Sequence, residues 1–196
     1  MERIIPDDLG PSSDLTMGHR FRYLLARGFL HAGDRVLDAA CGVGYGSHVL
    51  AQVPGVKVTG YDYDESAIKY AVEHYSLEMG AHGSETRFGF MDLDALQVPE
   101  GEPPYDACIS FETIEHLKNE PKVFADKLKK LSSRLIVVSA PIVPTVHLNG
   151  YHRHDVTEEQ LINLFQDDQW QVFEKVKQRV YGVIVACRRD KLALMR

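Results

Sequence analysis

The stretch Val36-Leu37-Asp38-Ala39-Ala40-Cys41-Gly42-Val43-Gly44-Tyr45-Gly46-Ser47 decides the fold that we expect for this chain. It starts as a short apolar run typical of a buried strand, passes through a turn with glycine at 42, 44 and 46, and then enters a helix. Glycine lets the backbone turn sharply and lets a ligand approach without meeting a Cβ atom. The helix that follows presents unpaired N–H groups and the positive end of its dipole. Asp38 is expected to face the same crevice, which would suit a nucleotide-like ligand with one anionic and one cationic part.

Helix-like and strand-like periods of apolar residues alternate along the chain on both sides of this turn. We expect strands at 35–39, 56–61, 86–91, 105–111 and 134–139, and helices at 17–31, from the turn to Gln52, after Asp64 and after Pro121. Thr157 and Gln160 form a capping box for a further helix, and β runs at 170–178 and 180–187 predict an antiparallel hairpin. The pattern predicts an α/β fold with a doubly wound, mostly parallel sheet of seven strands. Its ligand crevice is expected at the carboxyl ends of the strands.

The spacing of apolar residues also predicts which face of two helices is buried. In the helix at 17–31, the apolar stripe contains Phe21, Leu24, Leu25 and Phe29. In the helix after Asp64, it contains Ile68, Ala71, Val72 and Tyr75.

Length and composition favour one globular domain. The chain has 196 residues, 44% of them hydrophobic, and no linker rich in Pro, Gly or Ser divides it. We therefore expect a single domain over 1–196. Within it, 1–31 is expected to form an N-terminal helical cap, and 141–156 an irregular loop at the crevice.

Charge and cysteine content narrow the partners and the compartment. The net charge is −6 and no run of Lys or Arg resembles a nucleic-acid footprint, so nucleic acid is not an expected partner. Cys41, Cys108 and Cys187 are odd in number and far apart, which favours reduced thiols and a cytoplasmic location. No stretch approaches the ~20 apolar residues of a membrane span, and the N-terminus lacks the apolar run of a signal peptide. The oligomeric state stays open.

The glycine spacing distinguishes between two classes of nucleotide-binding protein. Dinucleotide enzymes carry G-x-G-x-x-G, whereas Ser47 stands here at the place of the third glycine. The segment 38–44 resembles instead motif I of class I methyltransferases that use S-adenosylmethionine (SAM), in which D-x-G-C-G-x-G is common. Ala40 replaces the first glycine of that motif. The resemblance implies the class I methyltransferase fold. Around the methionine part of SAM it implies Asp38, Ala40, Cys41, Gly42 and Gly44.

Further segments of the same family follow in order along the chain. Asp62 at the end of the second strand, followed by Tyr63, resembles the acidic residue that binds the ribose hydroxyls. Asp92-Leu93 resembles the segment that contacts adenine, with Asp94 as an alternative to Asp92. Residues 110–117 read S-F-E-T-I-E-H-L and resemble the segment after the fourth strand. Aromatic candidates for holding the sulfonium cation are Tyr23, Tyr45 and Phe111.

The segment after the fourth strand carries candidate catalytic groups. Methyl transfer from a sulfonium is an in-line displacement, so alignment of acceptor, methyl and sulfur supplies much of the catalysis. An alcohol acceptor must also lose its proton, and Glu115 and His116 are candidate bases. On a helical turn, Glu112, Glu115 and His116 would share one face.

The pattern E-x-x-E-H at 112–116 also resembles two metal-dependent groups. They are the O-methyltransferases of ubiquinone biosynthesis and the terminal-ribose methyltransferases of small RNAs. The latter need a further histidine downstream, which His152 could supply. Oxygen and imidazole ligands suit a divalent cation, so a metal stays open without being expected.

The irregular loop at 141–156 is a natural lid over an acceptor. Its three histidines, tyrosine and arginine suit a polar or anionic acceptor. The segment H-R-H-D-V-T-E-E-Q-L that starts at His152 resembles the family segment H-L-R-E-F-T-x-E-E-L, with His154 in place of its arginine. Short segments at 2–6 and 22–26 resemble the opening of a methyltransferase group often associated with surface-glycan biosynthesis, which favours a sugar-like or phosphorylated acceptor.

These resemblances together imply a SAM-dependent methyltransferase that acts on oxygen of a small molecule or of a sugar-like or phosphorylated acceptor. Glu115, His116 and His152 are the residues expected around the acceptor. A metal-assisted RNA ribose methyltransferase is an alternative that the acidic charge disfavours. A SAM-binding regulatory subunit without turnover is another, which the intact E-x-x-E-H and the polar lid disfavour. The glycine spacing disfavours an NAD-dependent dehydrogenase.

Overall fold

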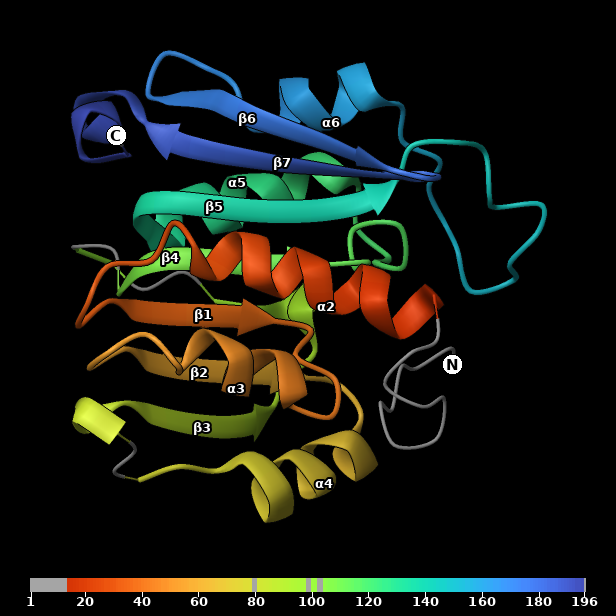
Figure 1. Ribbon diagram of the computed structural model, residues 1–196. Coiled ribbons are helices and arrows are strands. Elements are labelled where there is room, and N and C mark those ends of the chain that lie inside the picture. Colours follow the sequence, from red (N-terminus) through yellow and green to blue (C-terminus); the bar gives the residue numbers. More distant parts are fainter. Residues whose placement is uncertain (1–13, 79–80, 98–99, 102–103, 196) are drawn as a thin grey trace.

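The computed structural model describes residues 14–78, 81–97, 100–101 and 104–195. Through this part of the chain runs one sheet of seven strands in the order β3-β2-β1-β4-β5-β7-β6 (Figure 1). β7 is antiparallel to both of its neighbours and the other neighbouring pairs are parallel, which confirms the predicted sheet and hairpin. The strands are β1 (Arg35–Ala39), β2 (Lys57–Asp62), β3 (Glu85–Phe90), β4 (Tyr105–Phe111), β5 (Ser132–Pro141), β6 (Trp170–Gln178) and β7 (Tyr181–Arg188).

Helices cover both faces of the sheet (Figure 1). α2 and α3 pack on one face, and α5 and α6 pack on the other. α4 contacts β2, β3 and α3. The α-helices are α2 (Asp14–Arg27), α3 (Tyr45–Leu50), α4 (Glu65–Tyr75), α5 (Pro121–Leu131) and α6 (Glu158–Leu164), and the short 3-10 helices are η1 (Ala81–Gly83), η2 (Leu93–Ala95) and η3 (Arg189–Met195).

Local capping sets where three of these helices begin. The side chain of Asp64 accepts a hydrogen bond from the Ala67 amide at 3.0 Å at the start of α4. Pro121 occupies the first turn of α5, where its missing N–H costs nothing. Thr157 and Gln160 form the predicted capping box, because the Thr157 hydroxyl accepts from the Gln160 amide and the Gln160 side chain accepts from the Thr157 amide.

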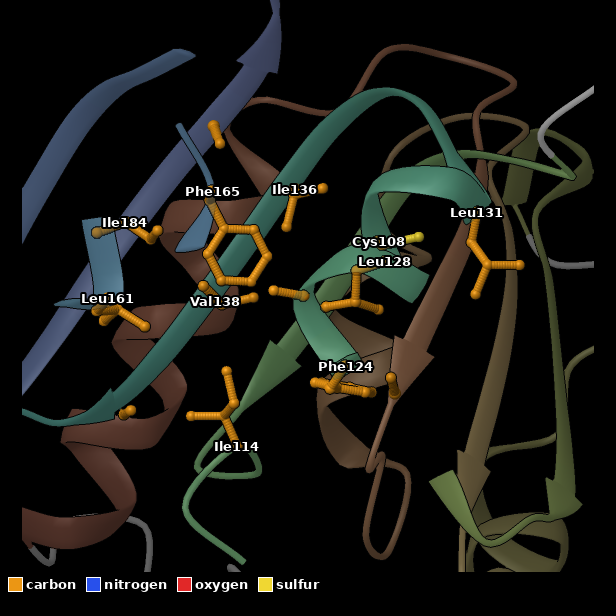
Figure 2. Packing of buried hydrophobic residues seen from close by; sticks show 14 of the residues in the cluster. Cys108, Ile114, Phe124, Leu128, Leu131, Ile136, Val138, Leu161, Phe165 and Ile184 are labelled. Carbon is orange, nitrogen blue, oxygen red and sulfur yellow. The ribbon is translucent and has the colours of Figure 1, made fainter. Parts of the chain in front are cut away.

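The larger apolar core lies between the sheet and α5 and α6 (Figure 2). Phe124, Leu128 and Leu131 lie on one stripe of α5 and are buried, as predicted. They pack in one cluster with Ile136 of β5 and with Phe165, which follows α6. Complete burial of an apolar side chain of this size contributes about 1.5–3 kcal/mol, so this cluster is a main source of the stability of the sheet.

The buried face of α2 differs from the predicted stripe. Arg22, Tyr23 and Ala26 are buried, whereas Phe21 is 41% exposed and Leu24 is 37% exposed. The predicted stripe is wrong for Phe21 and Leu24, whereas Leu25 and Phe29 pack against the core. The prediction considered only apolar side chains. The two polar residues have hydrogen-bond partners beneath the helix, which allows them to take buried positions.

The buried face of α4 is also narrower than predicted. Ala67 and Ala71 are buried, but Val72 is 47% exposed. Small side chains are needed because α4 lies close to the glycine turn. A Cβ atom added to Gly44 would come within 2.7 Å of the Ala71 Cβ. This close approach decides which face of α4 is buried.

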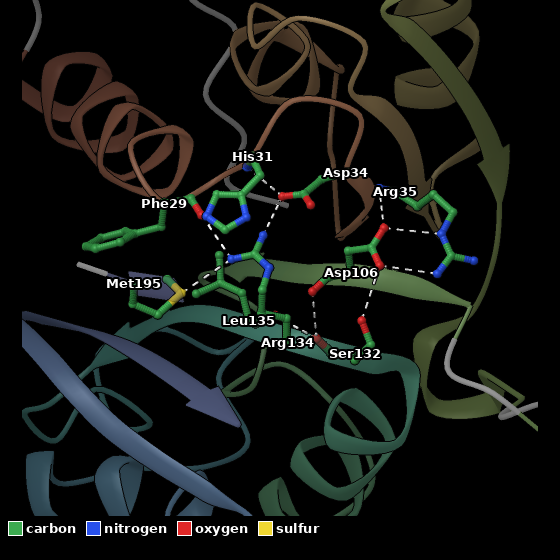
Figure 3. Close-up of polar contacts among 10 residues, drawn as sticks. Phe29, His31, Asp34, Arg35, Asp106, Ser132, Arg134, Leu135 and Met195 are labelled. Atoms are coloured by element: carbon green, nitrogen blue, oxygen red, sulfur yellow. Dashed lines mark hydrogen bonds and ion pairs between the residues drawn. The ribbon is translucent and has the colours of Figure 1, made fainter. Parts of the chain in front are cut away.

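Polar contacts join the first residues of β1, β4 and β5 (Figure 3). Arg134 of β5 pairs with Asp34 and donates a hydrogen bond to the Phe29 carbonyl at 3.2 Å. Arg35 of β1 pairs with Asp106 of β4 at 3.2 Å. The pair of Arg134 and Asp34 is buried, so removing one partner would leave an uncompensated charge. These contacts fix the amino ends of the strands, at the opposite end of β1 from the glycine turn.

Part of the expected organisation lies outside the described residues. The cap expected at 1–31 is described only from Asp14 onward, and the segment at 2–6 is not described. The expected loop at 141–156 contains no helix or strand after Pro141, the last residue of β5. Within the described ranges, every helix is too short or too polar to cross a membrane.

Gly46 should be among the least replaceable residues of the fold. A Cβ atom there would lie 2.0 Å from Cζ of Tyr23, which is itself buried. We expect Gly46→Ala to lower the free energy of unfolding by about 1–3 kcal/mol, the usual cost of overpacking, as measured by urea denaturation. Gly150→Ala is the matched control, because a Cβ atom at that position meets nothing within 4 Å. Equal stabilities of the two variants would contradict this packing.

Candidate active site

A cavity of about 940 Å³ lies at the carboxyl ends of the central strands. The glycine turn after β1, the segments after β2 and β4, the loop after β5, the helix α2 and the β6–β7 turn all contribute to its wall. Most of the predicted site residues line it: Ala40, Cys41, Gly42, Tyr45, Asp62, Tyr63, Asp92, Leu93, Phe111, Glu115, His116 and His152. Asp38 and Gly44 do not line it.

Left-handed backbone conformations build the glycine turn. The φ angle is 71° at Ala40, 53° at Gly42 and 86° at Gly44. Alanine pays about 1 kcal/mol for such a conformation, which gives a physical reason for glycine at that position of the motif. The Gly42 amide donates to one oxygen of Asp62 at 2.9 Å, and the Asp64 amide donates to the other at 3.0 Å. Asp62 therefore fixes the turn after β1 to the end of β2.

Asp38 lies beneath the turn, which corrects the expectation that it faces the crevice. Its side chain is completely buried and accepts hydrogen bonds from the Ser47 hydroxyl at 2.6 Å and from the Tyr23 hydroxyl at 3.1 Å. Burial raises the pKa of Asp38 from 3.8 to about 7. The side chain is directed to the helices α2 and α3, so it shapes the cavity only through them.

Two aspartates after β3 have different roles. The Asp94 carboxylate accepts hydrogen bonds from the Lys118 and Asn119 amides, both at 2.9 Å. Asp92 caps η2 through the Asp94 amide, and its other oxygen lies 3.8 Å from Nζ of Lys118. Because Asp94 is engaged in holding the segment after β4, Asp92 is the better placed of the two for a ligand.

The segment after β4 is a turn rather than a helix. Glu112 has a φ of 51°, outside the helical range, and the His116 amide donates to the Thr113 carbonyl at 2.9 Å. Glu112, Glu115 and His116 therefore do not share a helical face, which corrects that expectation. Glu112 instead accepts a hydrogen bond from the Ser139 hydroxyl at 2.6 Å.

Glu115 is a buried carboxylate in the wall of the cavity. The residue is 1% exposed, and neither of its side-chain oxygens has a hydrogen-bond partner among the described residues. Burial, and then the nearby charge of Glu112, raise the pKa of Glu115 well above its usual value. A buried polar group without a partner is costly, so such a group is a candidate for function.

Two histidines complete this group. Nε2 of His116 lies 4.0 Å from Glu115, and the rings of His116 and His152 are 4.7 Å apart. One ligand atom from each of Glu115, His116 and His152 lies within 4.8 Å of the others. Nδ1 of His116 is 3.1 Å from the Tyr151 carbonyl, which can only accept. The neutral ring therefore carries its proton on Nδ1 and keeps the lone pair on Nε2.

Comparisons with known proteins identify the family. A family model described as a methyltransferase domain matches residues 30–188. The chain belongs to this family of methyltransferase domains. With its sheet order and antiparallel last strands, it is a SAM-dependent methyltransferase domain of the class I fold.

The methyltransferase domain is similar to proteins of diverse activity. A probable SAM-dependent methyltransferase of Mycobacterium tuberculosis is 27% identical over 139 residues, 67% of this chain and 47% of that protein. Phosphoethanolamine N-methyltransferase 1 of Triticum aestivum is 28% identical over 138 residues, 65% of this chain and 26% of that protein. The chain thus spans half or less of the length of these relatives. A structure of magnesium protoporphyrin IX methyltransferase from Synechocystis PCC 6803 with bound SAM has a TM-score of 0.67 and 25% identity, and the match covers 89% of this chain and 82% of that one.

In this methyltransferase domain, the loop at 141–156 is tied to the turn after β4. The amides of Arg153 and His154 donate to the Glu115 carbonyl at 2.7 and 3.2 Å. Nε2 of His154 contacts the Leu117 carbonyl at 3.0 Å, so this histidine serves to anchor the loop. These bonds place His152 beside Glu115 although 36 residues of sequence separate them from one another.

Two groups of wall residues were not predicted from the sequence. α2 contributes Met17, Gly18, His19, Phe21 and Arg22, and the β6–β7 turn contributes Gln178, Arg179 and Tyr181. Apolar periodicity places α2 on the sheet without indicating that one edge of it borders a cavity. The one available signal was the polar pair of Arg22 and Tyr23 inside an apolar stripe, which is unusual for a core face.

Asp38 should make the stability of the domain depend on pH. Its pKa is raised on folding, so its favourable contribution is complete below its unfolded pKa of about 3.9 and is lost as the pH rises through about 7. As the pH rises from about 5 to about 8, the free energy of unfolding of wild type should fall relative to that of Asp38→Asn. The fall should be about 1.4 kcal/mol for each pH unit until the pH reaches the folded pKa of about 7. Urea denaturation across this range measures the difference. Asp168→Asn, at an exposed position, is the control and should follow wild type.

Proposed function

We propose that this methyltransferase domain transfers a methyl group from SAM to an oxygen atom of a small molecule or of a sugar-like or phosphorylated acceptor. The observation that carries this proposal is the buried carboxylate of Glu115 beside His116 and His152 in the cavity wall. Such a group suits removal of a proton from a hydroxyl acceptor. An amine acceptor in its neutral form already has a free lone pair on nitrogen. It therefore depends less on a base in the site than a hydroxyl acceptor does.

The proposed place of SAM follows from the donors and acceptors along the wall. Each oxygen of Asp62 accepts a hydrogen bond from a backbone amide, which fixes the carboxylate at the edge of the cavity, and the two ribose hydroxyls are proposed to bind to it. Asp92 and the adjacent Leu93 line the same cavity as Asp62, and we propose that they contact the adenine. The open backbone at Gly42, where an added Cβ atom would meet nothing within 4 Å, leaves room for the methionine part.

The catalytic role of the protein is positioning and proton removal. The methyl group moves in a single in-line displacement from sulfur to the acceptor oxygen, which favours a site that holds both reactants in line. Nε2 of His116 is the proposed base, since its Nδ1 is engaged with the Tyr151 carbonyl. An oxygen of Glu115 lies 4.0 Å from Nε2, so the Glu115 carboxyl borders the same acceptor position. His152 positions the acceptor hydroxyl.

The proposed acceptor class follows from the side chains around the opening. Lys118, Arg153 and Arg179 line the cavity and are exposed, which suits a phosphorylated or otherwise anionic group. Leu148 and Tyr151 are also exposed in the wall, 75% and 60%, and offer an apolar surface for the face of a sugar ring. The relatives include an N-methyltransferase, so the choice of oxygen rests on the site.

A divalent cation held by Glu115, His116 and His152 is the second candidate. Their ligand atoms lie within 4.8 Å of one another, a spacing that an ion at the centre can bridge. A cation there would lower the pKa of a bound acceptor hydroxyl. This candidate includes the RNA ribose methyltransferase, which the net charge of −6 continues to disfavour.

The cysteines support a reducing compartment, which we propose to be the cytoplasm. Cys41, Cys108 and Cys187 are all buried, and none is in a disulfide. Burial raises the pKa of the Cys187 thiol, which keeps it protonated and inert.

Asp62→Ala should weaken binding of SAM by at least ~1.5 kcal/mol, the scale of a lost hydrogen bond to a charged group. Isothermal titration with S-adenosylhomocysteine, the product, measures the loss. Because Asp62 also holds the Gly42 amide, Asp62→Asn serves as the conservative control and should lose less. Unchanged affinity in both variants would rule out this cofactor position.

His152→Ala and Glu115→Gln should each lower turnover by about a hundredfold or more while leaving affinity for SAM nearly unchanged, because both residues act on the acceptor side. Release of S-adenosylhomocysteine over a panel of sugar, phosphorylated and phenolic acceptors provides the measurement. The same assay in EDTA distinguishes the candidates. Full activity in EDTA supports a histidine base, and activity lost in EDTA and restored by Mg²⁺ supports the cation. Binding of SAM without turnover on any acceptor would favour a regulatory subunit.

A further inference from the structure

Exposed apolar side chains gather around the mouth of the cavity. In the described part of the chain, large side chains of this kind line the cavity at Met17, Phe21, Tyr63, Leu148 and Tyr151, and we call these residues the apolar rim. Their exposed fractions run from 41% at Phe21 to 75% at Leu148. Holding apolar groups in water is unfavourable, and where they gather in one region they commonly mark a surface that binds a partner.

The apolar rim is built by three segments at one end of the molecule. α2 contributes Met17 and Phe21, the segment after β2 contributes Tyr63, and the loop after β5 contributes Leu148 and Tyr151. The start of α2 and this loop lie at the same end of the sheet, and the loop projects beyond the strands (Figure 1). A single sugar ring in the cavity would cover only part of a rim that spans three segments.

The exposed charged side chains that line the cavity in the described ranges are cations. They are Lys118, Arg153 and Arg179, whereas the carboxylates that line it are buried or half-buried. Asp155 is an exposed acid of the loop after β5, but its carboxylate accepts hydrogen bonds from two backbone amides of that loop, at 2.6 and 3.0 Å. The mouth therefore presents positive charge next to the apolar rim, although the net charge of the chain is −6.

The backbone at the tip of this loop is hydrogen-bonded within the loop itself. The Leu148 amide donates to the Thr145 carbonyl at 2.8 Å, and the His152 amide donates to the Asn149 carbonyl at 3.0 Å. The Tyr151 amide donates to the Asn149 side chain at 3.0 Å. Backbone groups without a partner are costly in an apolar medium, so these bonds let the tip leave water at low cost.

We propose that the mouth of the cavity docks on the surface of an anionic lipid bilayer. Apolar side chains beside exposed Lys and Arg suit such an interface, because the apolar groups enter the boundary of the acyl chains while the cations meet the headgroups. Tyrosine rings favour the headgroup level, where one edge is apolar and the other is wet. Charge complementarity therefore selects the lipid surface as the occupant.

A second copy of this chain fits the same surface less well. In a two-fold interface the same patch faces itself, so the cations of one copy would lie against those of the other. An anionic bilayer instead complements Arg153 and Arg179 and accepts Leu148 and Phe21 in its apolar region.

Docking in this orientation would open the cavity towards the lipid. An acceptor would then reach the site from the bilayer, as an amphiphile whose apolar part stays among the acyl chains. This consequence for the acceptor rests on the proposed function, whereas the docking itself does not.

Co-sedimentation with vesicles, without SAM or acceptor, tests the docking and its apolar part. Wild type should bind vesicles of phosphatidylcholine and phosphatidylglycerol about tenfold or more tightly than vesicles of phosphatidylcholine alone, and added salt should weaken this binding. Leu148→Ser should lose about tenfold in affinity, because it removes an apolar side chain from the interface. Leu194→Ser is the matched control and should bind as wild type does, since Leu194 is 53% exposed and lies in η3 at the other end of the molecule.

A second pair of variants tests the charge. Arg153→Gln should lose about fivefold in affinity for the anionic vesicles and bind the neutral ones as wild type does. Lys191→Gln removes one positive charge from an exposed residue of η3 and should change neither affinity. Thermal unfolding shows whether the variants are folded.

The outcomes separate this inference from the proposed function. Equal binding of wild type to both kinds of vesicle, binding to neither, or equal affinities of wild type and Leu148→Ser would each overturn the docking. A wild-type dimer in analytical ultracentrifugation that Leu148→Ser dissociates would overturn it as well, and would assign the apolar rim to a contact between copies. If the vesicles are not bound but an acceptor is methylated, the inference fails and the proposed function stands. Binding to anionic vesicles without turnover on any acceptor supports the docking and contradicts the proposed function.

Discussion

The buried carboxylate of Asp38 holds together the three segments on which the cavity depends. Asp38 is the residue before the last of β1, and its carboxylate accepts hydrogen bonds from Ser47 of α3 and from Tyr23 of α2. The Tyr23 ring fills the space that the missing side chain of Gly46 leaves. The centres of the Tyr23 and Phe111 rings are 4.9 Å apart, and the rings are nearly perpendicular. The turn, both helices and the end of β4 are therefore positioned by one another. Burial away from water raises the pKa of the Asp38 carboxyl. Keeping this group buried at the centre of the site therefore costs free energy whenever it is ionised.

Other residues in the wall of the cavity also reduce the stability of the fold, through buried polar groups or strained backbone conformations. Among the described residues, both buried oxygens of Glu115 and the buried Nε of Arg22 have no hydrogen-bond partner. Ala40 and Glu112 adopt left-handed backbone conformations. Each of these would be removed by selection for stability alone. The amino ends of the strands show the contrast, since Arg134 and Asp34 are buried there as a complete pair. The unpaired groups lie where a ligand is expected to complete them.

The sequence predicted the strands and the caps, because these depend on local spacing, and most of the residues that it singled out for the site line the cavity. The apolar stripe of α5 and the capping box at Thr157 are of this kind. The direction of Asp38, the buried face of α2 and the turn at Glu112 were not predicted correctly. All three depend on contacts between residues far apart in the chain, such as that of Tyr23 with Asp38 or of Glu112 with Ser139. No periodicity in a single segment records such partners.

The two ends of the cavity differ in how the fold determines them. The proposed donor end is built from the ends of β1 and β2, whose register is parallel, and from the turn after β1, which Asp62 fixes. The proposed acceptor end is built from the loop after β5 and the β6–β7 turn, which the sheet positions only at their bases. Hydrogen bonds tie the loop to the turn after β4, and two of them are donated by the Arg153 and His154 amides to the Glu115 carbonyl. Changes in the length or sequence of that loop alter the acceptor side without disturbing the cofactor side, as long as these two bonds are kept. This separation gives a physical reason why relatives with the same fold act on different acceptors.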